Sequence, residues 1–133
     1  MNAINPYISV LVYFLAVSLV IIAATFLFNL VVRYKVWDEI HRGNVAVALS
    51  SGGVVLGVAN IMHYAIRTND DLINTLIWGG FGTVLLLAVY LAFELLTPKL
   101  PVSEEIAKGN KAVGLISFFY SLAFSFVIGA SIT

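Results

Sequence analysis

Cysteine is absent from this sequence, and charged side chains are scarce. Without cysteine the chain has no disulfide, no thiolate ligand for a metal and no thiol nucleophile. Charged residues make up 11% of the 133 residues, whereas a soluble domain carries roughly 25%. The seven basic and seven acidic residues cancel, so the chain lacks the net positive charge that attracts nucleic acid. These shortages exclude a thiol enzyme, a nucleic-acid-binding protein and an ordinary soluble domain.

Hydrophobic side chains supply 61% of the chain, and the mean hydropathy is +1.01. They gather in four runs that contain no Asp, Glu, Lys or Arg, over residues 1–32, 43–66, 72–93 and 112–133. A bilayer core of about 30 Å needs about 20 helical residues, and in lipid each span must satisfy its own backbone hydrogen bonds. We therefore expect an all-α polytopic membrane protein, with four transmembrane helices in a single membrane domain, residues 1–133, that contacts the lipid bilayer.

The basic residues predict the direction of the spans. Arg67 lies in the second connection, and the other six lie in the first and third connections: Arg33, Lys35, Arg42, Lys99, Lys108 and Lys111. Under the positive-inside rule the first and third connections face the cytoplasm, and both termini lie outside. The first run has no basic residue before it and is longer than the apolar part of a signal peptide, so we expect it to be retained as a helix.

An internal repeat connects the two halves of the chain. Residues 39–49 align without gaps on residues 105–115, and seven of the eleven positions are identical. Each half, 1–66 and 67–133, is then a helical hairpin whose connection carries the motif. Because each hairpin has an even number of spans, the second copy has the same orientation as the first, unlike the inverted repeats of many transporters. The sequence predicts two parallel tandem hairpin repeats.

The doubled motif Glu-Ile-x-Lys/Arg-Gly-Asn-x-Ala-Val-Gly/Ala precedes both the second and the fourth span. In this respect the chain resembles the YjfL-like family of small bacterial inner-membrane proteins, known as domain of unknown function 350, and the resemblance covers nearly the whole chain. It implies four helices in two repeats and a location in the bacterial cell (inner) membrane. It brings no established activity.

The motif has a structural and a functional interpretation. Its acidic and basic residues stand three apart in each copy, so each pair can meet on one helical face, but exposed pairs contribute only a few tenths of a kcal/mol. Gly followed by Asn is typical of a helical corner. The alternative is a polar layer or gate at the cytoplasmic mouth of the bundle. The candidate residues are Glu39, Arg42, Gly43, Asn44, Glu105, Lys108, Gly109 and Asn110.

Glu94 is the remaining candidate for the polar layer. It lies near the cytoplasmic end of the third span, where Asn29 occupies the equivalent place in the first span. A carboxylate at membrane depth is costly unless it finds a partner or water. Glu94 either pairs with a lysine of the third connection at headgroup level, or it binds a proton or cation in a cytoplasmic vestibule.

Small residues indicate the packing faces of two spans. The fourth span has Ser117, Ser121, Ser125 and Gly129 at intervals of four, and the second has Gly53 and Gly57. Small residues let transmembrane helices approach closely, and hydroxyls can form hydrogen bonds across the contact. The stripes serve either packing within one chain, contact between subunits, or the lining of a pore.

Recognisable catalytic or cofactor motifs are absent from the sequence. We find no Ser-His-Asp set, P-loop or zinc signature, and His63 lacks the spaced companions of a metal ligand. Ser103 is expected to cap the acidic turn at Glu104 and Glu105. We therefore predict no enzyme activity, no cofactor and no metal.

Two functional hypotheses follow. The first is a helix-bundle oligomer, most simply a homo-oligomer, that passes or gates an ion or small solute through the polar layer. The second is a membrane anchor or scaffold that presents its two cytoplasmic motifs to a soluble partner involved in envelope stress or membrane remodelling. Flux through the reconstituted protein would favour the first hypothesis, and one dominant cytoplasmic crosslink would favour the second.

Overall fold

Helices make up nearly all of the protein. The computed structural model describes residues 5–96 and 101–132. The helices are α1 (Pro6–Val31), α2 (Val36–His41), α3 (Val45–Thr68), α4 (Leu72–Leu96), α5 (Val102–Ala107) and α6 (Lys111–Ser131). The four long helices have 21 to 26 residues, and at about 1.5 Å per residue each can cross the hydrocarbon core. The predicted all-α membrane protein with four transmembrane helices is confirmed, and these spans imply contact with the lipid bilayer.

Side-chain caps determine where the long helices begin. Pro6 occupies the first turn of α1, and the Asn5 side chain accepts a hydrogen bond from the Tyr7 N–H at 2.9 Å. Asn44 and Asn110 cap α3 and α6 in the same way. The helices therefore begin one residue after each asparagine, close to the starts predicted at 43 and 112, because a cap stabilises only the N–H groups of the turn that follows it.

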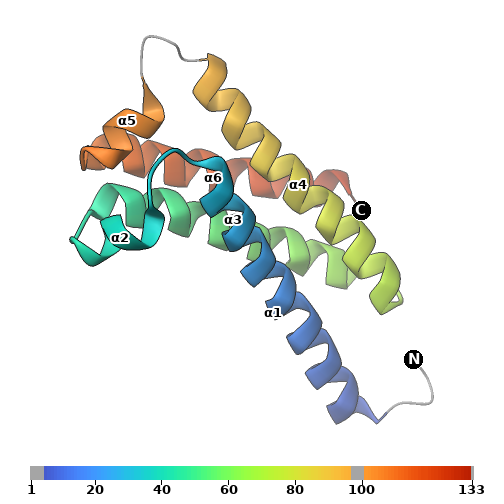
Figure 1. Cartoon of the computed structure of the whole chain (residues 1–133). Coiled ribbons are helices and arrows are strands. Elements are labelled where there is room, and N and C mark those ends of the chain that lie inside the picture. Colours follow the sequence, from blue (N-terminus) through green and yellow to red (C-terminus); the bar gives the residue numbers. More distant parts are fainter. Residues whose placement is uncertain (1–4, 97–100, 133) are drawn as a thin grey trace.

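α3 is the central helix of the bundle. Its buried residues occupy almost every turn from Ala46 to Ala65. α6 lies beside α3 along its length, and α1 and α4 slope across this pair (Figure 1). α3 and α6 run in the same direction, because contacts join Ser50 to Ser117 near their starts and Asn60 to Ser125 further along.

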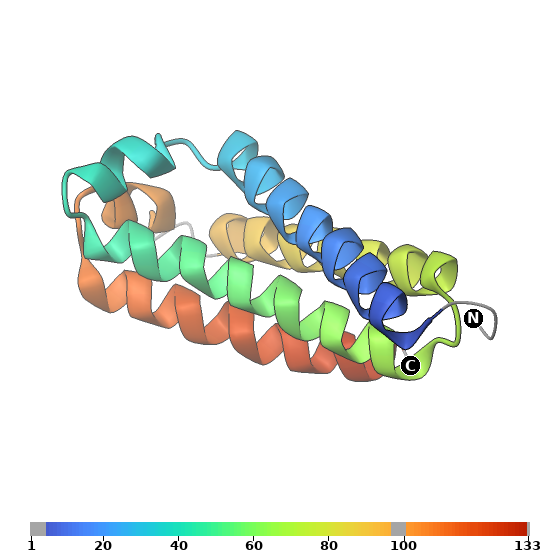
Figure 2. The same ribbon diagram turned by 90° about the horizontal axis from the view of Figure 1, so that it is seen from below.

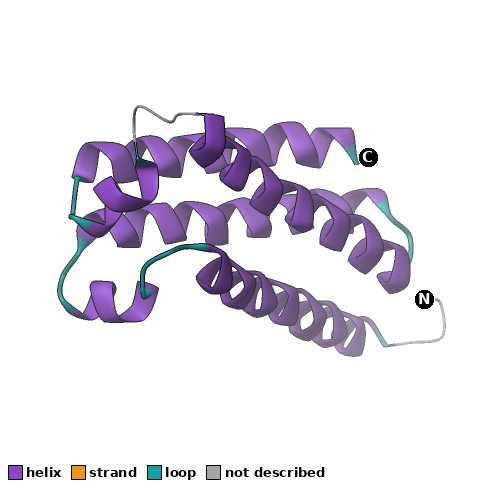
Figure 3. Cartoon of the chain, turned by 45° about the horizontal axis from the view of Figure 1, so that its top comes forward, coloured by secondary structure: helices purple, strands orange, loops and turns teal. Residues whose placement is uncertain are grey.

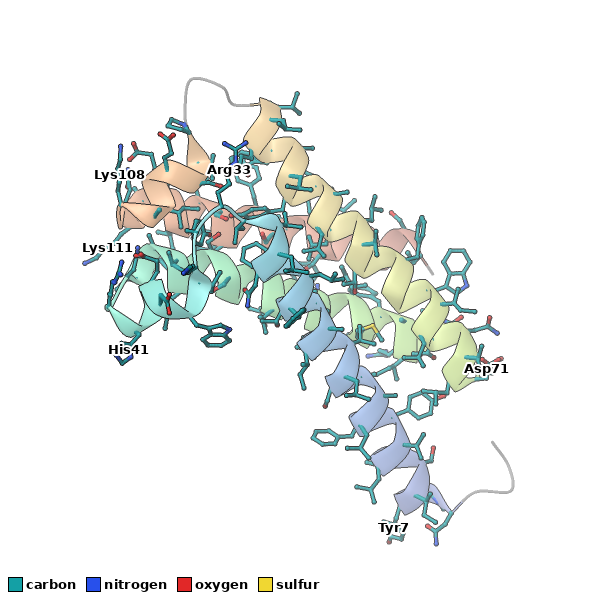
Figure 4. All side chains as sticks on the ribbon, viewed as in Figure 1. Tyr7, Arg33, His41, Asp71, Lys108 and Lys111 are labelled. Atoms are coloured by element: carbon teal, nitrogen blue, oxygen red, sulfur yellow. The ribbon has the colours of Figure 1, made fainter. Side chains whose placement is uncertain are left out.

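The two short helices lie together at one end of the bundle. α2 precedes α3 and α5 precedes α6, and both sit at the end opposite to the start of α1 and the end of α6 (Figures 2 and 3). Arg33, His41, Lys108 and Lys111 gather at this α2/α5 end, whereas Tyr7 and Asp71 mark the other end (Figure 4). Lys99, which contributed to the predicted orientation, lies outside the described residues.

α1 is the least buried of the four long helices. Only Ala24 and Phe28 are buried among its residues, and the Tyr7 end stands clear of the other helices (Figure 4). The Phe28 ring meets the Tyr90 ring of α4 edge to face, with centroids 5.1 Å apart. The remaining apolar surface of α1 needs no protein contact, because lipid solvates it as well as another side chain would.

Candidate functional site

Each short helix ends at a glycine with a left-handed backbone. Gly43 has a φ of 82° and Gly109 a φ of 88°. In the first corner the Gly43 N–H donates to the Ile40 carbonyl, and the Asn44 N–H donates to the Glu39 carbonyl, both at 2.9 Å. The second corner has the same pair of bonds. This is the Schellman arrangement, which satisfies carbonyls that a helix end leaves free.

The asparagine after each glycine forms hydrogen bonds with both helices of its corner. Asn44 accepts a hydrogen bond from the Val47 N–H and donates from Nδ2 to the Glu39 carboxylate, both at 3.2 Å. Asn110 caps α6 in the same way and donates to the Glu105 carboxylate at 3.0 Å. In each copy the motif thus closes one helix, opens the next and holds the glutamate between them.

The basic residues of the motif complete this local network. Arg42 Nη1 lies 3.0 Å from Glu39 Oε1, and Lys108 Nζ lies 4.0 Å from Glu105 Oε1. The Arg42 and Lys108 side chains are 73% and 69% exposed, so solvent screens both pairs and each contributes little to stability. The eight corner residues of the predicted polar layer form two helix corners.

The two corners differ in one respect that affects packing. Besides its local bonds, Asn44 donates from Nδ2 to the carbonyls of Ile106 and Ala107, both at 3.1 Å. These carbonyls belong to the last turn of α5, where helical partners are missing. Among the described residues Asn110 makes no matching bond to α2. The Asn44 side chain of the first corner therefore binds the second corner, and the described residues show no equivalent bond from Asn110 to the first corner.

Glu94 lies apart from the corners, in a cavity of about 430 Å³ at the α2/α5 end. The cavity lies between the segment that follows α1, the end of α4 and the helix α5. Its lining residues are Arg33, Tyr34, Glu94, Leu95, Pro101, Ser103, Glu104 and Ala107. The structure thus divides the predicted polar layer: Glu94 is in the cavity, and Glu39, Asn44, Glu105 and Asn110 are in the corners.

Two hydroxyl groups of the cavity lining have no hydrogen-bond partner in the described part of the chain. They are the Tyr34 hydroxyl and Ser103 Oγ, and both are shielded from solvent. The expectation that Ser103 caps α5 is wrong, because Pro101 occupies the cap position and Ser103 lies inside the helix, 5% exposed. Buried hydroxyls nearly always find a partner, so these two are exceptions among the described residues.

A cluster of buried hydroxyls continues from the cavity into the bundle. Ser50 Oγ of α3 lies 2.8 Å from the Tyr90 hydroxyl of α4 and 2.9 Å from Ser117 Oγ of α6. The Tyr34 hydroxyl lies next to Tyr90 and Ser50. Burial raises the pKa of Tyr34 well above its ordinary value, and the neighbouring Tyr90 raises it further, so the Tyr34 hydroxyl keeps its proton. This hydroxyl cluster joins three transmembrane helices.

Glycines at the contact of α3 with α6 let the two backbones meet. A Cβ on Gly114 would lie 2.7 Å from the Ala46 Cα, and a Cβ on Gly53 would lie 2.7 Å from the Phe118 Cα. A Cβ on Gly57 would lie 3.3 Å from the Ser121 carbonyl oxygen of α6 and 2.8 Å from the Leu86 side chain of α4. These approaches are closer than side chains tolerate, which is the reason small residues stand here.

The serine stripe of α6 also lies inside the monomer. Ser117, Ser121 and Ser125 are buried, and Asn60 Nδ2 of α3 donates to Ser125 Oγ at 3.0 Å. Gly129 packs against the Tyr64 ring. The structure thus places the stripe against α3, which favours packing within one chain over contact between subunits.

Two other polar residues have local structural partners. With its amide oriented so that both ends form hydrogen bonds, Asn29 accepts from Trp37 Nε1 at 3.2 Å and donates to the Thr25 carbonyl at 3.3 Å. His63 is exposed and meets the Tyr64 ring edge to face. In the described ranges, no three His, Asp or Glu side chains gather as a metal site would require.

Most of the hydroxyl cluster and of the cavity was not predicted from the sequence. Ser50, Tyr90 and Tyr34 were not proposed as site residues, because each lies within or beside an apolar run. One signal was available: Tyr90 stands four residues before Glu94, so both lie on one face of α4. Arg33 was counted only as a charge that sets orientation.

The chain is similar to proteins of bacterial membranes. The profile of the family described as Domain of Unknown Function (DUF350) matches residues 2–132. The UPF0719 transmembrane protein YshE of Bacillus subtilis (strain 168) is 40% identical over 128 residues, covering 96% of each chain. A UPF0719 transmembrane protein of Aquifex aeolicus (strain VF5) is 32% identical over 89 residues, which are 66% of this chain and 33% of that protein. No solved structure matches the chain.

Proposed function

The chain belongs to the DUF350 family of transmembrane proteins, and from this premise we propose that it is a non-enzymatic oligomer of the bacterial inner membrane that passes or gates an ion or small solute. The observation that carries the proposal is the continuity between the cavity beside Glu94 and the buried hydroxyl cluster. Tyr34 belongs to both, because its ring lines the cavity and its hydroxyl lies beside Tyr90 and Ser50.

The direction of entry follows from the charges. Most of the basic residues gather at the α2/α5 end, so the positive-inside rule assigns this end, and with it the cavity, to the cytoplasm. Among the described lining residues, Glu94 and Glu104 supply two carboxylates and Arg33 supplies one guanidinium. The balance favours a solute that carries positive charge in at least one part.

The hydroxyl cluster closes the proposed path of the solute through the bundle. Ser50, Tyr90 and Ser117 occupy the space where α3, α4 and α6 meet, and their hydroxyls bond to one another rather than to solvent. A hydroxyl both donates and accepts, so the same groups can bond to a passing solute once the helices separate. The structure then corresponds to the closed state.

Oligomer formation rests on the surfaces that the monomer leaves open. α1 and the aromatic face of α6 with Phe119, Tyr120 and Phe126 are exposed, whereas the small-residue stripe of α6 is already used inside the chain. We assign subunit contacts to α1 and the outer face of α6. The duplication of the two hairpins stays a prediction, supported by the equal geometry of the two corners.

Flux through proteoliposomes tests the proposal. The purified chain is reconstituted, and ion and solute flux is measured under pH, potential and concentration gradients. Glu94→Gln should reduce the flux, because it removes a carboxylate from the cavity. Asp70→Asn, which makes the matching change on the exposed connection at the other end, should leave it unchanged. Absence of flux under every gradient would reject the proposal.

An exposed surface favours a second function, that of a scaffold. Trp37 on α2 is 65% exposed, and the acidic Asp38 and Glu104 are exposed on the two short helices of the same end. Such a surface could hold a soluble partner. Crosslinking from Trp37 or Glu104 in cells should give one dominant soluble protein if the chain is a scaffold, and contacts between copies of the chain if it forms a pore.

A further inference from the structure

The cavity at the α2/α5 end contains unpaired charges of both signs. Arg33, Glu94 and Glu104 all line it, yet the ion pairs of the described chain are those of the corners, and none joins Arg33 to either carboxylate. A lone anion would meet the two carboxylates, and a lone cation would leave Arg33 without a partner. Charges that share a cavity without neutralising one another favour a ligand that carries both signs.

The Arg33 guanidinium supplies the hydrogen-bond donors for the anionic part of the ligand. The hydroxyls of Tyr34 and Ser103 are shielded from solvent, so they do not reach the open space of the cavity. Arginine matches the geometry of phosphate oxygens, which accept several hydrogen bonds at once. The anionic part of the ligand is therefore best a phosphate.

The place and size of the cavity fit a headgroup. It lies where α1 and α4 end, at the depth of phospholipid headgroups. Leu95, Pro101 and Ala107 give it an apolar wall. Its volume of about 430 Å³ falls within the range of small-molecule sites.

We propose that this cavity binds a zwitterion composed of a primary ammonium and a phosphate, the chemistry of an ethanolamine phospholipid headgroup and of soluble glycerophosphoethanolamine. Arg33 binds the phosphate, and Glu94 and Glu104 accept hydrogen bonds from the ammonium. The inference rests on the site of the proposed function and names the class of its ligand.

Lipid binding to the full chain in detergent tests the inference. Native mass spectrometry compares phosphatidylethanolamine, phosphatidylcholine and phosphatidylglycerol with identical acyl chains. The choline headgroup has no N–H to donate, and the glycerol headgroup has no cation, so phosphatidylethanolamine should bind about tenfold more tightly than either, the effect of one hydrogen bond to a charged group. Equal binding of the three lipids would overturn the proposal.

Variants assign the two halves of the ligand. Glu94→Gln should reduce the preference for ethanolamine over choline, and Arg33→Gln should weaken binding of both lipids. Asp70→Asn and Arg67→Gln carry the matching charge changes near the opposite end and should bind like the unaltered chain. Arg33→Lys keeps the positive charge but loses the paired N–H geometry that suits phosphate, and it provides a milder variant whose intermediate binding is expected even if another charge variant fails to fold. Unchanged binding by all three cavity variants would reject the site.

A competition experiment identifies the source of the ligand. If soluble glycerophosphoethanolamine displaces phosphatidylethanolamine, the cavity binds the free compound; if it does not, the membrane-anchored headgroup is the ligand. Both results support the chemistry assigned to the site. Selective binding without flux in proteoliposomes would reject passage and keep this inference, whereas flux without selective binding would reject the inference alone.

Discussion

Asn44 donates from its side-chain amide to the backbone carbonyl of Ile106 across 3.1 Å, and through this bond the first hairpin holds the last turn of α5. A second bond, to the Ala107 carbonyl, strengthens the same contact. Both bonds join residues more than 60 positions apart in the sequence. The Asn44 side chain therefore links the two halves of the chain at the α2/α5 end.

The unequal corners predict unequal effects of the same substitution. Both Asn44→Ala and Asn110→Ala remove a helix cap and a bond to the glutamate of the same corner, but Asn44→Ala also removes both bonds to α5. A cap contributes about 1 kcal/mol, and each net hydrogen bond contributes a similar amount. Asn44→Ala should cost about 1–2 kcal/mol more than Asn110→Ala in unfolding experiments in detergent. Equal costs would show that the bonds across the corners contribute nothing.

Gly114→Ala should separate α3 from α6. The new methyl group would lie 2.7 Å from both the Cα and the carbonyl oxygen of Ala46, and neither backbone atom can move alone. Overpacking of this kind costs about 1–3 kcal/mol. Gly80→Ala is the control, because nothing lies within 4 Å of the Cβ at that position, and it should be neutral or slightly stabilising. Thermal unfolding of the two variants measures the difference.

Tyr34→Phe should separate stability from activity. The Tyr34 hydroxyl is buried without a hydrogen-bond partner in the described chain, and such a group costs about 1–3 kcal/mol. The phenylalanine variant should therefore unfold at a higher temperature, yet pass less solute, because the hydroxyl cluster has lost one member. Tyr90→Phe, which breaks the bond to Ser50, is expected to lower stability. A less stable Tyr34→Phe chain would contradict this assignment.

The start of α4 should weaken at low pH. Asp71 accepts hydrogen bonds from the Asn74 backbone N–H at 2.7 Å and from its side-chain amide at 2.9 Å, and these bonds hold the pKa of the Asp71 carboxyl below its ordinary value. Because the folded pKa is the lower one, the stabilisation is present above the ordinary pKa of aspartate and is lost as the pH falls through the folded value. Unfolding measured from neutral to acidic pH should show this loss, and Asp71→Asn should reduce it.

The transmembrane spans could be predicted from the sequence, but which helices pack against one another could not. Runs without charge identify a transmembrane helix because lipid excludes charge. In lipid, however, an apolar residue is equally suited to face a neighbouring helix or the acyl chains. Gly53 and Gly57 indicated a packing face on α3, but the sequence did not indicate that α3 is central and that α1 is mostly exposed.

The candidate site was predicted in part. The doubled motif identified both corners, since Gly before Asn favours the backbone that Gly43 and Gly109 adopt. The small residues of α6 were singled out as a packing face, and the structure places them against α3. The cavity could not be predicted, because Tyr34, Glu94 and Ser103 come from three segments, and whether these segments meet depends on how the helices cross.

Only two side chains of α1 are buried, so we expect most of the surface of this helix to face acyl chains. A helix held in this way adjusts its tilt to the thickness of the surrounding bilayer. Its firm attachment is the edge-to-face contact of Phe28 with Tyr90, whose hydroxyl bonds to Ser50. A change in membrane thickness should therefore change the tilt of α1 and with it the contact between Phe28 and Tyr90.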